Sequence, residues 1–148
     1  MDQAQIPDWL VTEVPGAKDL ISWFGSWPSF HDAEVISIEL VRSGPSRIAV
    51  HAFERTRELD PNGFYVCRKH VIVTFLLSGI QSLRLEHFNH QNVLAGLWLT
   101  RAEEGYTLEL EGCFGADGSI AAESICIEFA PGAPADSQYL GAANSSTT

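Results

Sequence analysis

Apolar and polar residues alternate with a period of two over most of this chain, which is typical of β-strands that bury one face. The segment 17–24 differs, because its apolar residues recur at spacings of three and four and Gly25 follows directly. This spacing predicts a short helix that ends at Gly25.

Seven later segments have strand patterns, and they are expected near 36–41, 47–55, 70–77, 81–87, 93–101, 106–111 and 124–129. In the first strand the buried face is expected to hold Ile36, Ile38 and Leu40. The run 70–77 is almost wholly apolar, which favours a central strand covered on both faces. Short connections favour antiparallel pairing, so the predicted fold is α+β: a mostly antiparallel β meander of about seven strands with a short N-terminal helix packed on the sheet.

Turn residues separate these strands and suggest the domain limits. The sequences Asp-Pro-Asn-Gly at 60–63 and Glu-Glu-Gly at 103–105 are typical of turns. After Pro131 the composition narrows to small and polar residues. We therefore expect one globular domain over 1–130 and a flexible C-terminal tail over 131–148.

The charge is unevenly distributed along the chain. Residues 1–85 hold ten acids and eight bases, whereas residues 86–148 hold nine acids and one base, Arg101. The second part thus carries −8 of the formal net charge of −10. Such a field repels phosphate backbones and anionic lipids, so we expect neither nucleic acid nor membrane as a partner. A net negative charge can also simply keep the protein soluble.

Several classes of protein do not fit this sequence. There is no apolar run long enough for a membrane-spanning helix and no basic-then-apolar leader, so a cytoplasmic location is expected. The three cysteines are widely spaced and are expected to be reduced. Phosphate-binding glycine motifs and local signatures of serine or cysteine nucleophiles are missing, and we expect no cofactor.

Histidines and acids give the only local candidates for chemistry. Asp32 and Glu34 could share a face of the first strand, with His31 beside them, but Asp32 is also suited to bracing the turn while His31 packs under the tryptophans. His87 and His90 lack the helical spacing of a His-x-x-x-His metal site. No metal site is expected.

Two separated segments resemble a known family. The segment 23–35 reads WFGSWPSFHDAEV and the segment 85–93 reads LEHFNHQNV. Together they resemble the bacterial immunity protein 50 family of toxin–immunity systems, over roughly residues 20–129. The matching positions are expected to hold the fold rather than to contact a toxin: Trp27, Phe30, His31, Asp32, Phe88, Asn89 and Asn92.

The resemblance implies a non-enzymatic protein that binds and neutralises a cognate bacterial toxin. Nuclease toxins are commonly basic, and an acidic surface would steer such a partner. The hypothesised partner-binding residues are therefore acids of the second half: Glu103, Glu104, Glu109, Glu111 and Glu128.

Two alternatives from other classes stay open. One is a small hydrolase or metal-dependent enzyme that uses Asp32, Glu34 and a histidine. The other is a homo-oligomer that pairs through the edge strands of an open meander.

Overall fold

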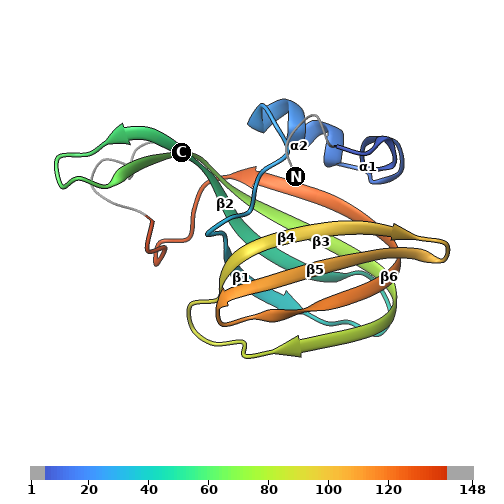
Figure 1. The fold of residues 1–148 in the computed structure, drawn as a ribbon. Helices are drawn as coiled ribbons and strands as arrows, with labels where there is room; N and C mark the ends of the chain where they lie inside the picture. The colour runs from blue at the N-terminus through green and yellow to red at the C-terminus, as the bar shows by residue number, and fades with distance from the viewer. Residues whose placement is uncertain (1–5, 140–148) are drawn as a thin grey trace.

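The computed structural model describes residues 6–139, and a closed antiparallel barrel forms its body (Figure 1). The spatial order of the strands is β1-β2-β3-β6-β5-β4. The first and last strands of this order, β1 and β4, pair at Glu34 and Val93 and close the barrel. The predicted fold class, largely β and antiparallel with a small N-terminal helical part, is confirmed. The six strands are β1 (Glu34–Glu39), β2 (Ser46–Leu59), β3 (Tyr65–Glu86), β4 (Val93–Ala102), β5 (Gly105–Phe114) and β6 (Asp117–Pro131).

The strand count is six instead of about seven because β3 unites two expected strands. The sequence Ser78-Gly79 was expected to separate them, but the backbone continues through it. Gly79 has a φ of +68°, and the pairing of β3 with β6 shifts register between Ile80 and Ser82. This irregularity is a β-bulge, which bends a strand without ending it and so helps the sheet to close. The order also differs from a simple meander, because β3 pairs with β6 and not with β4.

The expected buried face of the first strand is wrong at two of its three positions. Val35 is buried, whereas Ile36 and Leu40 are exposed and Ile38 is only half-buried. The cause is a register shift between Val35 and Ser37 in the pairing with β2. The bulge leaves Ile36 outside and places both Val35 and Ile38 towards the core, a break in alternation that a period-two pattern cannot reveal. Leu40 lies beyond the end of β1.

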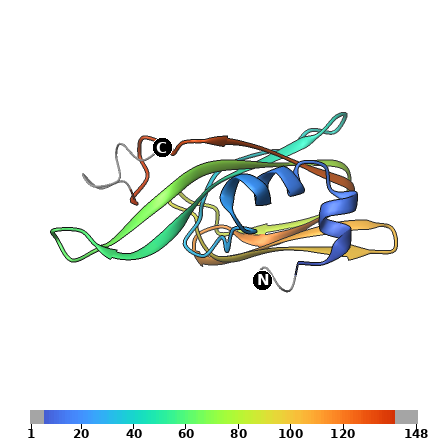
Figure 2. The ribbon, with the colours of Figure 1, turned by 90° about the horizontal axis from the view of Figure 1, so that it is seen from above.

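Two short helices lie across one side of the barrel (Figures 1 and 2). They are α1 (Asp8–Glu13), which was not expected, and α2 (Ala17–Phe24), which has the predicted limits and ends at Gly25. Leu10, Leu20 and Phe24 join the core of the barrel. Neither helix within residues 6–139 is long and apolar enough to cross a membrane.

The link between the helices rests directly on β6. Ile127 N–H donates to the carbonyl of Pro15, and a Cβ on Gly16 would lie 1.9 Å from the Ile127 oxygen. Gly16 also has a φ of +90°. Only glycine fits this position, so the sequence Pro15-Gly16 fixes where the helices dock.

β2 and β3 extend beyond the barrel as a two-stranded projection (Figure 2). We call residues 54–69 the β2–β3 arm. Its turn is the one predicted at 60–63: Gly63 N–H donates to the Asp60 carbonyl at 3.0 Å, and Asp60 Oδ1 accepts from the backbone N–H groups of Asn62 and Phe64.

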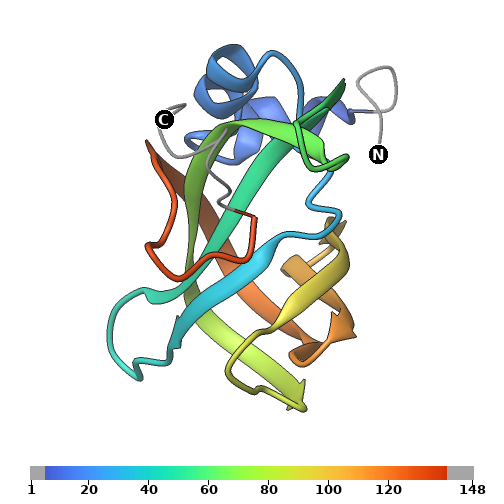
Figure 3. The ribbon, with the colours of Figure 1, turned by 90° about the vertical axis from the view of Figure 1, so that its left-hand side faces the viewer.

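The chain after β6 folds back along β1 and β2 (Figure 3). Gly132 N–H donates to the His70 carbonyl at 2.9 Å, and Tyr139 packs on Phe53 with ring centroids 4.6 Å apart. These residues, 132–139, belong to the segment expected to be a flexible tail. The rest of that segment, 140–148, lies outside the described residues.

Candidate functional site

The two motif segments meet where the barrel closes. Leu94 N–H donates to the Ala33 carbonyl, and Asp32 N–H donates to the Leu94 carbonyl, each at 2.8 Å. Val35 N–H donates to the Asn92 carbonyl at 2.9 Å. The resemblance between distant segments therefore corresponds to one structural feature, the seam between β1 and β4.

Two motif asparagines organise the loop that leads into β4. Asn92 Oδ1 accepts from the backbone N–H groups of Asn89 and Ala116, and Asn89 Oδ1 accepts from those of Gln91 and Asn92. Asn92 is buried and has a φ of +52°, a conformation that asparagine tolerates better than most residues. These contacts hold the loop against the turn that precedes β6.

The other motif residues fall into a buried and an exposed group. Trp27 and Phe30 are buried and pack edge to face. The expectation that His31 packs under the tryptophans is wrong, because its side chain is 63% exposed while Nδ1 lies 3.1 Å from the Ala95 carbonyl. The ring of Phe88 is also exposed.

Asp32 and Glu34 do not form the joint site that the hydrolase alternative needs. The chain turns at Asp32, which has a φ of +65°, and its carboxylate pairs with Arg55 at 2.5 Å at the base of the β2–β3 arm. Glu34 instead turns inward to His51.

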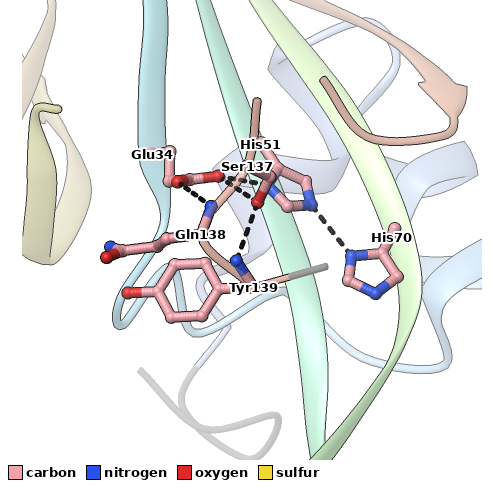
Figure 4. A network of polar contacts seen from close by, with 6 residues as sticks. All are labelled: Glu34, His51, His70, Ser137, Gln138 and Tyr139. Carbon is pink, nitrogen blue, oxygen red and sulfur yellow. Dashed lines mark hydrogen bonds and ion pairs between the residues drawn. The ribbon is translucent and has the colours of Figure 1, made fainter. Parts of the chain in front are cut away.

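Glu34 is the outer end of a polar network that crosses β1, β2 and β3 (Figure 4). Its Oε1 accepts from Nδ1 of His51 at 2.8 Å, and Nε2 of His51 lies 2.9 Å from Nδ1 of His70. Both histidines are fully buried. Nε2 of His70 has no hydrogen-bond partner among residues 6–139.

The segment after β6 covers this network and bonds to the same carboxylate. The Ser137 hydroxyl donates to Glu34 Oε1 at 2.6 Å, and the backbone N–H of Gln138 donates to Oε2 at 3.2 Å. Tyr139 N–H then donates to the Ser137 oxygen at 3.1 Å. The Glu34 carboxylate thus joins β1 and β2 to the C-terminal segment, and His51 extends the network to His70 on β3.

The environment of the network shifts the pKa of several groups. Burial raises the pKa of Glu34, but hydrogen bonds from its three donors outweigh burial, and the net pKa lies below 4.5. Burial lowers the pKa of His70 below 6.5, and the neighbouring His51 adds to that shift. Burial raises the pKa of Tyr139 to about 12. Near neutral pH the site therefore holds an ionised Glu34 and a neutral His70.

The geometry of these groups is not that of a nucleophile with its base. A serine nucleophile donates its hydroxyl hydrogen bond to a ring nitrogen that has no other partner. Ser137 instead donates to Glu34 Oε1, and the ring nitrogen nearest to its hydroxyl, Nδ1 of His51 at 3.4 Å, is bonded to the same carboxylate oxygen. Within residues 6–139 no three His, Cys, Asp or Glu side chains are placed to share a metal ion. The arrangement serves to fasten chain segments together.

An open groove of about 270 Å³ lies beside the network. It is bounded by the start of β1, the loop 88–92 and the segment 134–138, and it places Phe88 near Glu34 and Asp136. No lysine or arginine is among its lining residues.

The five acids proposed as a partner site are all exposed, but they do not form one patch. Glu103 and Glu104 lie in the turn between β4 and β5, and Glu109 and Glu111 share the outer face of β5. Glu109 faces Ser119 on β6, and Glu128 lies about 30 Å further along that strand. None of the five forms an ion pair with another residue of the described part of the chain.

An exposed tryptophan joins Glu109 and Glu111 on the outside of the barrel. Trp98 on β4 is the cross-strand neighbour of Glu109, and Gly96 is that of Glu111. The indole of Trp98 lies over Gly96, because a Cβ added to Gly96 would be 2.5 Å from the ring. Trp98 is 38% exposed. We call Trp98, Glu109 and Glu111 the β4–β5 face.

The sequence interpretation missed the buried network. His51 and His70 each lie in an otherwise apolar strand segment, and that position was a usable sign of buried histidines. Nothing in the sequence marked Ser137, which lies in a segment of small polar residues. The geometry depends on the register of three strands and could not be deduced locally.

Comparison with known proteins places the chain in a family. Neither the curated proteins nor the solved structures gave a significant match. A family model described as immunity protein 50 matches residues 16–130, which include both motif segments and all six strands except the last residue of β6. The chain belongs to the immunity protein 50 family, a membership that implies toxin neutralisation.

Proposed function

We propose that this chain neutralises its cognate toxin by direct, stoichiometric protein–protein binding, and that the toxin presents a basic, nuclease-like surface. Family membership supports toxin neutralisation as the general role. The observation that supports a basic partner is a set of exposed acids that have no ion-pair partner within residues 6–139: Glu103, Glu104, Glu109, Glu111 and Glu128.

The β4–β5 face is the proposed centre of contact. Glu109 and Glu111 are exposed, have no ion-pair partner within residues 6–139, and project from the same side of one strand. Unpaired surface charges of one sign steer an oppositely charged protein and speed its encounter. Glu103 and Glu104 extend this field at one end of the strand pair, whereas Glu128 contributes only at long range.

Trp98 supplies the apolar part of the proposed contact. Aromatic side chains near the centre of an interface commonly contribute most of the binding energy, and charged residues around them set orientation and association rate. Because the indole rests on Gly96, the ring is held along the strand before any partner arrives, which reduces the entropy lost on binding.

A titration of toxin activity tests direct binding. The cognate toxin is purified, and increasing amounts of the chain are added. A binding protein removes activity linearly and reaches complete inhibition at an equimolar ratio, while the mass of the toxin stays unchanged. Co-purification of the two proteins is expected as well.

The hydrolase alternative gives a different result in the same titration. An enzyme that destroyed the toxin would inhibit at far less than equimolar amounts and would alter the mass of the toxin. Either outcome, or failure of the two proteins to associate, contradicts the proposed function.

A further inference from the structure

The tip of the β2–β3 arm exposes three large apolar side chains next to one another. Leu59 and Tyr65 are a cross-strand pair, and Phe64 precedes Tyr65. Their exposed fractions are 62%, 55% and 70%. Single exposed apolar residues are common, but a group of three at the end of a projecting hairpin is typical of an interaction surface.

The tip is held in shape by its own polar contacts. Asp60 Oδ1 accepts two backbone hydrogen bonds across the turn, and the Thr56 hydroxyl donates to the Val66 carbonyl at 2.8 Å. The three apolar side chains therefore stand on a closed turn and not on an open loop. A surface formed before binding loses less entropy when a partner covers it.

Most charges of the arm have internal partners, and the exposed Arg57, two residues before Leu59, is the exception among residues 54–69. Arg68 pairs with Glu58, Lys69 lies 3.8 Å from Glu54, and Arg55 pairs with Asp32. Between Leu59 and Tyr65 the sole charged residue is Asp60. The tip, residues 59–65, thus presents three exposed apolar side chains and one carboxylate, and little charge has to be desolvated when it is covered.

We propose that this tip is a second contact, which inserts into a pocket of the cognate toxin that is apolar inside and has a lysine or arginine at its rim. The proposal rests on the function proposed above, since a basic toxin supplies the cation opposite Asp60. The β4–β5 face attracts the toxin through charge, and the arm tip anchors it through apolar contact, which slows dissociation.

Truncation of the apolar tip tests the anchor. The double variant Leu59→Ala/Phe64→Ala in the full chain is expected to raise the Kd for the purified cognate toxin about tenfold or more, mainly through faster dissociation. The matched control Leu40→Ala/Phe114→Ala removes the same residue types at half-exposed positions outside the arm and is expected to change the Kd less than about twofold.

A separate variant tests the single carboxylate. Asp60→Asn keeps an oxygen that can accept the two turn hydrogen bonds but removes the charge. It is expected to raise the Kd about threefold and to leave the melting temperature unchanged. An unchanged Kd would contradict the proposal that a lysine or arginine lies at the rim of the pocket.

Hydrogen exchange locates the contact without any substitution. In the wild-type complex, the backbone amides of residues 59, 60 and 62–66 are expected to exchange more slowly than in the free chain; Pro61 has no amide hydrogen. Suppose that the complex forms, these amides stay unprotected and the double variant binds normally. The arm-tip proposal is then wrong, but the proposed function stays intact. Absence of any complex overturns both.

Light scattering of the free chain tests the other possible occupant of the tip. If the wild type is dimeric and Leu59→Ala/Phe64→Ala is monomeric, the tip binds a second copy of this chain, and the toxin-pocket proposal is wrong. A monomer for both proteins is the expected result.

Discussion

Carboxylates have opposite environments in two regions of this molecule. Glu34 lies in the polar network beneath the segment 134–139, and its two oxygens accept three hydrogen bonds, from His51, Ser137 and Gln138. Glu109 and Glu111 lie on the open β4–β5 face and have no ion-pair partner within residues 6–139.

The difference separates acids that serve the fold from acids available to a partner. A partly buried carboxylate is stable as an anion only when donors surround it, so Glu34 can fasten the C-terminal segment but has little free capacity for a new ligand. An exposed carboxylate contributes little to folding, and its field extends into solvent. The predictions below follow from this contrast.

The largest expected effect is on the stability of Glu34→Ala. This substitution leaves the donors of His51, Ser137 and Gln138 without their acceptor, and it is expected to lower the free energy of unfolding by about 2–4 kcal/mol. Urea denaturation measures it. The matched variant Glu109→Ala is expected to stay within about 0.5 kcal/mol of the wild type. Equal losses of unfolding free energy for the two variants would contradict the distinction between acids that serve the fold and acids available to a partner.

The next effect is a loss of stability on acidification. The pKa of His70 is lowered in the folded protein, so below pH 6.5 the unfolded chain binds more protons than the folded one, and stability falls as the pH drops towards the folded pKa. The lowered pKa of Glu34 adds a further loss below about pH 4.5.

Thermal melts between pH 7.5 and 5 test the contribution of His70. The wild type is expected to melt at lower temperature as the pH falls, and His70→Phe is expected to show a smaller decline. The control His90→Gln, at an exposed position, should decline as the wild type does. An unchanged pH dependence in His70→Phe contradicts the assignment to this group.

A smaller effect is expected for Ser137→Ala. Loss of one hydroxyl donor to Glu34 is expected to cost about 1 kcal/mol and to act mainly on the C-terminal segment. Amides of Gln138 and Tyr139 should then exchange faster, while those of the barrel strands keep their protection. Uniformly faster exchange throughout the barrel would show that the segment is not a separate element.

The smallest effect is expected for the neutral variant Glu109→Gln/Glu111→Gln. Like charges on the same face of a strand repel, so their removal is expected to leave the free energy of unfolding unchanged or to raise it by up to about 0.5 kcal/mol. A clear loss of stability in urea denaturation would mean that these acids support the fold.

Features set by local pattern could be predicted from the sequence. The alternation in β4 and β5 gave the buried Leu97, Leu99, Leu108 and Leu110 together with the exposed Trp98, Glu109 and Glu111. The limits of α2 followed from its apolar spacing and Gly25. In the stretches 97–100 of β4 and 108–111 of β5, and in α2, burial follows the period of the sequence pattern, and no bulge interrupts these stretches of the two strands.

Features that depend on register between strands could not be predicted. The bulge in β1 reversed the expected burial of Ile36, and the bulge near Gly79 joined two expected strands. The network needs Glu34 opposite His51 across β1 and β2, with His70 one strand further. Such pairings are non-local, and no single segment of the sequence encodes them.

The most direct test of the central claim is the association rate constant for the toxin, measured by stopped flow from low to physiological salt. The variant Glu109→Lys/Glu111→Lys is expected to lower this constant about tenfold or more at low salt and to flatten its salt dependence. The control Asp19→Lys/Glu39→Lys makes the same change in net charge at exposed positions away from the β4–β5 face and should have a clearly smaller effect. If the first variant associates at the wild-type rate with the wild-type salt dependence, the β4–β5 face does not capture the toxin.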